Sequence, residues 1–99
     1  MKEKRKFPRS TLPQKAKFFG AKGWEDCLII EASREGLRVK FFTDEKINEG
    51  AIIQLKVLAP SEPKPVMVKG LLRWIKKERE HFVGGIKVLR IDRGVRYEK

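Results

Sequence analysis

The chain has few of the residues from which metal centres and thiol chemistry are built. It contains one cysteine, Cys27, and one histidine, His81. A single cysteine cannot form an internal disulfide, and this pair cannot supply the four ligands of a usual structural zinc site. Cys27 lies in the apolar segment DCLII and is expected to be a small buried side chain. His81 is expected at the surface, beside a charged turn, so no resident metal or cofactor is predicted.

Catalytic motifs are also lacking. Catalysis requires a nucleophile, a base and an orienting group within reach of one another. The acidic residues lie mostly in expected turns, and they show neither HExxH nor paired-aspartate nor phosphate-loop spacing. The sequence therefore predicts a protein that is not an enzyme.

Long apolar runs are missing too. No segment approaches the roughly 20 apolar residues that a membrane-spanning helix needs. The N-terminus is basic, but no apolar segment follows it, so it does not read as a secretory signal. With its single thiol, the chain is expected to be a cytoplasmic protein without a membrane span.

Positive charge, in contrast, is abundant. Lys and Arg number 24 against 13 Asp and Glu, which gives a net charge of +11. Such a chain attracts phosphates and other polyanions. The N-terminal 22 residues contain one acid, Glu3, among these basic residues: Lys2, Lys4, Arg5, Lys6, Arg9, Lys15, Lys17 and Lys22. A solubilising tail and an anion-binding segment are both compatible with this charge.

Apolar and polar residues alternate in three segments, GLRVKFF, AIIQLKV and VMVKGLLRW. A period of two is typical of half-buried strands. Residues 14–19, 25–30 and 81–90 are further expected strands. The predicted inward-facing residues of the three alternating segments are Leu37, Val39, Phe41, Ile53, Leu55, Val57, Val66, Val68, Leu72 and Trp74.

Turn signals separate these strands at about ten-residue spacing. GAKG at residues 20–23 and ASREG at 32–36 are expected to close hairpins, and KKERE at 76–80 to join the last two strands. The pattern predicts an all-β domain, a small six-stranded antiparallel barrel or sandwich. A short helix is the alternative for residues 43–48 or the C-terminus. The expected division is a flexible basic arm (1–13), a barrel (14–92) and a tail (93–99).

The basic arm carries two arginines four residues apart, Arg5 and Arg9. Pro8 lies between them and disfavours helical geometry at the preceding residue, so the arm is expected to be extended or turned. A guanidinium group presents a flat fork of donors to phosphate or to the O6/N7 edge of guanine. We expect the arm to form half of an anion-binding site.

The segment EASREG supplies the second half of that expected site. An ionised Glu31 accepts hydrogen bonds, for example from guanine N1–H and N2, and Ser33 both donates and accepts. Gly36 can adopt a left-handed backbone. An ordinary hairpin turn, with Ser33 bonded to its own backbone, is the other interpretation.

The two pieces together resemble the PilZ domain, a receptor family for the bacterial second messenger cyclic di-GMP. The family has an RxxxR motif ahead of a six-stranded barrel, here RKFPR, and a D/N-x-S-x-x-G motif, here EASREG. GLRVKF and GLLRWIKKEREHFVGGIKVLRID also resemble its later strands. The resemblance implies that Arg5, Arg9, Glu31, Ser33 and Gly36 bind cyclic di-GMP. We expect rim contacts from Lys4, Lys6 and Arg34.

One position departs from the family pattern, because Glu31 stands where Asp or Asn is usual. The carboxylate is retained one methylene further from the backbone. The sequence leaves three functions open. They are a cyclic di-GMP receptor that signals to an unidentified effector protein, a ligand-free adaptor of the same fold, and a small basic barrel that binds single-stranded nucleic acid. The first is favoured, and nucleic acid is the least favoured partner.

Overall fold

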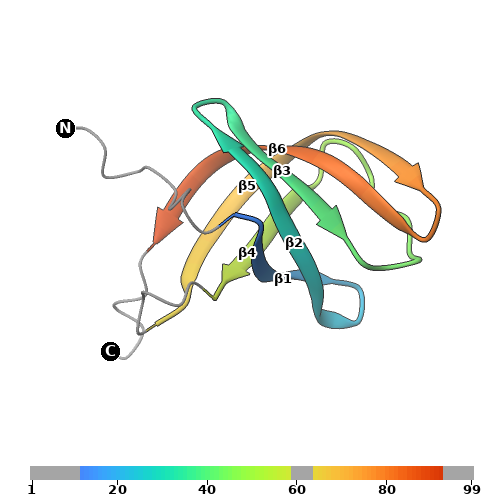
Figure 1. Ribbon diagram of the computed structural model, residues 1–99, viewed down its shortest axis with the longest axis horizontal. Coiled ribbons are helices and arrows are strands. Elements are labelled where there is room, and N and C mark those ends of the chain that lie inside the picture. The colour runs from blue at the N-terminus through green and yellow to red at the C-terminus, as the bar shows by residue number, and fades with distance from the viewer. Residues whose placement is uncertain (1–11, 59–63, 93–99) are drawn as a thin grey trace.

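The structure is a computed structural model that describes residues 12–58 and 64–92, and it consists of six strands in that part of the chain (Figure 1). Their bounds are β1 Gln14–Gly20, β2 Gly23–Ser33, β3 Gly36–Phe41, β4 Ile52–Val57, β5 Val66–Glu78 and β6 His81–Asp92. All pairings between them are antiparallel. These strands match the six predicted segments, except that Phe42 and Ala51 lie just outside β3 and β4.

The strands close into a barrel in the order β1-β2-β3-β6-β5-β4. Closure comes from β1, which pairs with β2 on one side and, through Ala16, Lys17 and Phe18, with β4 on the other. Every strand therefore has two hydrogen-bonded neighbours, and the sheet closes on itself. The prediction of an all-β, six-stranded antiparallel barrel is confirmed.

The barrel interior is filled by the inward-facing residues of the alternating segments. Phe41, Ile29, Leu55 and Leu72 are among its largest fully buried side chains. Burying side chains of this size contributes about 1.5–3 kcal/mol each. Phe18 packs edge-on against Phe41, with ring centroids 5.0 Å apart. Because side chains fill the interior of so small a barrel, ligands must bind at its ends or outer face.

Trp74 is the exception to the predicted inward set, and that prediction is wrong. Its side chain is 42% exposed, although Leu72 two residues earlier is buried. The pairing of β5 with β6 shifts register between Leu72 and Trp74, so Arg73 is an extra residue. A bulge of this kind reverses the faces of the residues that follow. Trp74 consequently lies on the outside of the barrel.

Residues 43–48 do not form the short helix that the sequence left open. Thr43 Oγ1 accepts a hydrogen bond from the Glu45 backbone N–H at 3.1 Å, which makes a local turn. Further on, Gly50 N–H donates to Leu72 O, and Leu72 N–H donates to Ala51 O. Residues 43–48 thus contain a local turn, and the adjoining Gly50 and Ala51 bond to Leu72 of β5. The C-terminal alternative, residues 93–99, lies outside the described part.

The predicted hairpins at residues 20–23 and 32–36 are confirmed, each with two turn residues. The third hairpin is tighter than expected. β5 continues to Glu78, so only Arg79 and Glu80 form its turn, with Arg79 at a φ of 49°.

Candidate functional site

The predicted EASREG motif forms the β2–β3 hairpin. Glu31 and Ser33 are exposed on the last residues of β2, Arg34 is exposed in the turn, and Gly36 begins β3. Ala32, between the two polar residues, packs against the core. The alternation therefore places Glu31 and Ser33 together on the outer face of the barrel. Four predicted site residues meet at this one hairpin.

Glu31 is held by a residue that the sequence analysis did not name as part of the site. Arg38 lies directly opposite Glu31 in the β2–β3 ladder, and its Nη2 is 2.8 Å from Glu31 Oε1. Both side chains remain about half exposed. Glu31 Oε2 and the other guanidinium N–H groups take no part in this salt bridge. The pair offers acceptors and donors side by side.

Ser33 is bonded within its own turn. Its Oγ accepts the backbone N–H of Glu35 at 3.1 Å, the arrangement expected of an ordinary hairpin. A hydroxyl carries one proton to donate, and this bond does not use it. Arg34 makes no ion pair with any residue in 12–58 or 64–92. Both groups therefore retain donors that point to solvent.

Position 36 requires glycine for two reasons, its backbone conformation and the close approach of β6. Its φ is +150°, and a Cβ there would overlap the carbonyl oxygen of Ile86 on β6. The Cα of Lys87 would be 3.3 Å from the same Cβ. The glycine lets β6 approach the hairpin closely, which brings the exposed Lys87 beside it.

A row of outer-face residues continues from this hairpin across the sheet. Arg38 pairs with Gly85 of β6, and Gly85 pairs with Trp74 of β5. A Cβ at Gly85 would overlap the Trp74 indole Nε1, so the ring lies on the glycine backbone. The row presents a carboxylate, a guanidinium and an indole in order: Glu31, Arg38 and Trp74. Alternation already placed Arg38 outside, but only the strand register shows its partners.

The start of the described chain lies at the same end of the barrel. Gln14, the first residue of β1, pairs with Ile29, two residues before Glu31. Its side-chain amide donates to Leu58 O at 3.2 Å, and Leu12 packs against the core. Because β1 and β2 are antiparallel, the N-terminal end of β1 lies beside the part of β2 that leads to Glu31. The predicted Lys4, Arg5, Lys6 and Arg9 lie outside the described residues.

The two residues first considered for other chemistry are not part of this hairpin. Cys27 is buried, and burial raises the pKa of its thiol to about 12. His81 Nε2 lies 3.7 Å from Glu78 Oε1 beside the β5–β6 turn. Within the described residues, no group of three or more His, Cys, Asp or Glu side chains is arranged to hold a metal ion. The same part of the chain contains no helix long and apolar enough to span a membrane.

Comparison with protein families identifies the barrel. The family model of the PilZ domain matches residues 3–97. The chain belongs to the PilZ domain family. PilZ domains are binding and receptor domains for cyclic di-GMP, so the family supports a cyclic di-GMP receptor. The match covers both the arm and the barrel of this PilZ domain. No curated protein matches the chain.

Proposed function

We propose that this PilZ domain is a receptor that binds cyclic di-GMP between its N-terminal arm and the outer face at the β2–β3 hairpin. The ligand combines two phosphates with two guanines, so it needs cationic donors, base-edge acceptors and flat surfaces. The proposed site residues are Arg5, Arg9, Glu31, Ser33, Gly36, Arg38 and Trp74, with Lys4, Lys6 and Arg34 at the rim. The family match and the hairpin geometry support this assignment.

The observation that carries the proposal is the pairing of Gln14 with Ile29. It puts the N-terminal end of β1, from which the arm would extend, beside the strand that ends in Glu31 and Ser33. Arg9 is three residues from Leu12, a span of at most about 10 Å for an extended chain. The RxxxR arginines are therefore within reach of the hairpin, although they are far from it in sequence.

Each proposed contact follows from a group that the geometry leaves available. Glu31 Oε2 accepts from a guanine edge while Oε1 stays on Arg38. The Ser33 hydroxyl donates to the base or a phosphate. The remaining Arg38 donors face phosphate, and the exposed Trp74 ring offers a stacking surface.

Arg5 and Arg9 then close over the ligand from the arm. Guanidinium groups suit this role because they bind phosphate with paired hydrogen bonds and stack on bases. A ligand that binds arm and barrel together selects the closed arrangement. An effector protein would read the altered arm and outer face, which is how a domain of this size transmits the signal.

Calorimetric titration with cyclic di-GMP tests the proposal. Replacing Arg9 with Ala removes charge-assisted hydrogen bonds worth about 1.5–3 kcal/mol, so affinity should fall about ten- to a hundredfold. The matched control is Lys56→Ala, which removes the same charge from β4. Lys56 lies over the Trp24 ring at 4.4 Å, away from the hairpin. This control should retain near-wild-type affinity.

The same titration separates the competing functions. Equal losses in Arg9→Ala and Lys56→Ala would mean non-specific attraction to a basic protein. If the wild-type barrel is folded but the titration with cyclic di-GMP gives no heat of binding, the ligand-free adaptor is the remaining function. A gel shift with single-stranded RNA or DNA that persists at higher salt would favour nucleic-acid binding.

A further inference from the structure

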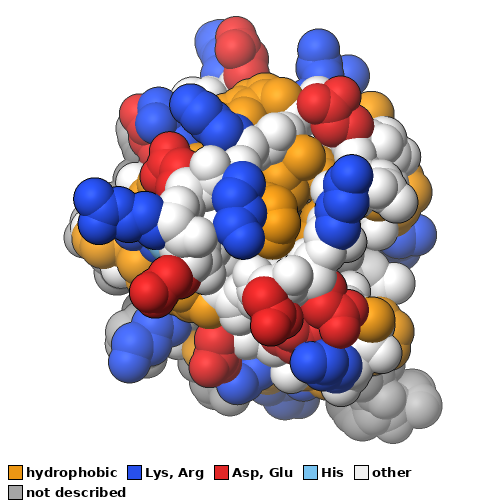
Figure 2. All heavy atoms as spheres, turned by 90° about the vertical axis from the view of Figure 1, so that its right-hand side faces the viewer, with side chains coloured by type: hydrophobic (Ala, Val, Ile, Leu, Met, Phe, Trp, Pro, Cys, Tyr) orange, Lys and Arg blue, Asp and Glu red, His pale blue; other side chains and the backbone are white. Residues whose placement is uncertain are grey.

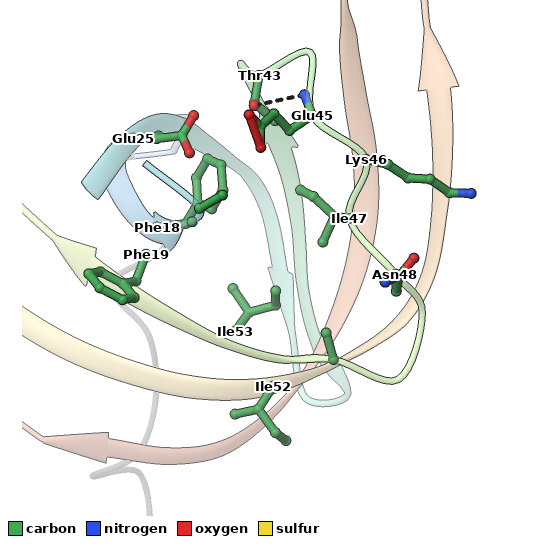
Figure 3. A pocket seen from close by; sticks show the side chains of 13 residues that line it. Phe18, Phe19, Glu25, Thr43, Glu45, Lys46, Ile47, Asn48, Ile52 and Ile53 are labelled. Carbon is green, nitrogen blue, oxygen red and sulfur yellow. Dashed lines mark hydrogen bonds between the residues drawn. The ribbon is translucent and has the colours of Figure 1, made fainter. Parts of the chain in front are cut away.

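A second surface lies where the β1–β2 turn meets the loop between β3 and β4 (Figure 3). It is a pocket of about 250 Å³ whose apolar lining includes Phe18, Phe19, Ile47 and Ile53. Figure 3 shows these side chains arranged around the opening, with the Glu25 carboxylate beside Phe18. The loop's bonds to β5 hold Ile47 at this mouth, since Gly50 N–H donates to Leu72 O at 2.8 Å.

This pocket is remote from the proposed cyclic di-GMP site. Glu25 lies near the start of β2 and Ser33 at its end. Eight residues of strand separate them, which corresponds to about 26 Å at roughly 3.3 Å per residue. A molecule in the pocket and a ligand on the β2–β3 hairpin would therefore occupy opposite ends of the barrel.

The mouth of the pocket exposes apolar side chains. Phe19 is 54% exposed and Ile52 is 53% exposed, and both belong to its lining. Phe19 packs edge-on against Trp24, with ring centroids 5.1 Å apart, which extends the apolar surface onto β2. Adjoining exposed apolar groups, unlike scattered ones, mark interaction surfaces.

One carboxylate at this mouth, that of Glu25, has no ion-pair partner among the described residues. Glu25 pairs with Phe18 across the β1–β2 ladder, and its carboxylate lies over Gly20. No Lys or Arg within residues 12–58 and 64–92 forms an ion pair with it. Glu45, on the loop between β3 and β4, forms an ion pair with Lys22 at 3.6 Å.

The adjoining loop is acidic in an otherwise basic protein. It carries Asp44, Glu45 and Glu49 against Lys46, whereas the whole chain has a net charge of +11. Figure 2 views this end of the molecule and shows an apolar strip exposed between charged side chains, with several acidic ones gathered beneath it. A partner that docks here must bring positive charge close to an apolar group.

The volume and the topology restrict the partner further. A pocket of about 250 Å³ is smaller than the roughly 300–1,000 Å³ typical of small-molecule sites, and it suits an inserted side chain. Along the pocket, β1 already pairs with β2 and β4 already pairs with β5. We therefore expect binding to depend on an anchor in the pocket and on charge at its rim.

We propose that this pocket docks a segment of a partner protein in which a large apolar side chain lies next to Lys or Arg. The apolar side chain inserts between Phe19, Ile47 and Ile52. The neighbouring cation pairs with Glu25. This surface goes beyond the cyclic di-GMP site and does not depend on it.

A library of 12-residue displayed peptides, selected against the full chain, tests this proposal. The enriched peptides should carry Leu, Ile, Phe or Met within two positions of Lys or Arg. Added to ¹⁵N-labelled protein, such a peptide should shift the amides of Phe19, Glu25, Ile47 and Ile52. Glu25→Gln and Ile52→Ser should each weaken it at least tenfold. The matched controls are Glu35→Gln, at the opposite end of the barrel, and Leu89→Ser, which is equally exposed on β6; both should bind as wild type does.

Three results would overturn the proposal: no enriched motif, equal binding by Glu25→Gln and Glu35→Gln, or shifts that map to another surface. A wild-type dimer that Glu25→Gln dissociates would make a second copy the occupant and would also overturn it. Cyclic di-GMP titrated into Ile52→Ser should match wild type. This last titration separates failure of the docking surface from failure of the receptor function.

Discussion

Glu31 and Arg38 face each other across the β2–β3 hairpin and form a salt bridge of 2.8 Å on the outer face of the barrel. The bridge holds the carboxylate on the same outer surface that carries Trp74. Glu31 is one methylene longer than the Asp or Asn usual in the family motif, and Arg38 provides the fixed partner that a longer side chain needs. The departure is thus matched by a neighbouring residue.

Replacing Arg38 with Gln should weaken cyclic di-GMP binding about ten- to a hundredfold, because it removes both a cationic donor and the partner that orients Glu31. The free energy of unfolding should change by less than about 1 kcal/mol, since the pair is half exposed. Calorimetry and urea denaturation measure the two effects. Affinity equal to wild type would remove Arg38 from the site.

Replacing Gly36 with Ala should destabilise the barrel by about 1–3 kcal/mol, because φ is positive there and the new Cβ would overlap Ile86 O. Gly23→Ala is the matched control. Gly23 also has a positive φ, of +100°, but nothing lies within 4 Å of its Cβ position. Urea denaturation should show the larger loss for Gly36→Ala. If both variants lose the same free energy of unfolding, the overlap with Ile86 O on β6 adds no destabilisation.

Cyclic di-GMP should quench tryptophan fluorescence through Trp74, since guanine would stack on its exposed ring. The chain has two tryptophans, and the other, Trp24, lies beneath Lys56 on a different part of the barrel. Trp24→Phe should therefore keep the ligand-dependent change, and Trp74→Phe should lose it. If the fluorescence change is kept in Trp74→Phe and lost in Trp24→Phe, the base does not stack on Trp74.

The Cys27 thiol should resist disulfide reagents at pH 8 in the native protein, because it is buried and its pKa is raised to about 12. Labelling should proceed only as fast as the barrel unfolds. Above about pH 9 the unfolded thiol ionises while the folded thiol stays protonated, so this group lowers the free energy of unfolding as pH rises towards 12. Cys27→Ala should show a shallower decline. Rapid native labelling would contradict the buried position.

The strands were predictable because burial on one face imposes a period of two on the sequence. Leu37, Val39 and Phe41 show this directly, since all three are buried as expected. Trp74 was misplaced because its face depends on a bulge in the β5–β6 pairing, which alternation cannot reveal. The helix alternative for residues 43–48 was wrong because the adjoining Gly50 and Ala51 bond to Leu72 of β5, far along the chain, and this cannot be read from local sequence.

The grouping of the proposed site residues on the barrel was predictable to a similar extent. Glu31, Ser33 and Gly36 lie close in sequence, so one hairpin had to bring them together. Arg38 and Trp74 join them only through strand register, which needs three strands to be placed. The pocket at the other end was not foreseen, because its lining comes from β1, β2, β4 and the loop between β3 and β4.

Titration of ¹⁵N-labelled protein with cyclic di-GMP tests the central claim most directly. Saturable shifts should be confined to residues 31–38, to Gly85, to the Trp74 indole and to the arm, and Arg9→Ala should weaken them together. The pocket residues Phe19 and Ile47 should not move. Absence of shifts, or salt-sensitive shifts spread over the basic surface, would contradict a built cyclic di-GMP site at the hairpin.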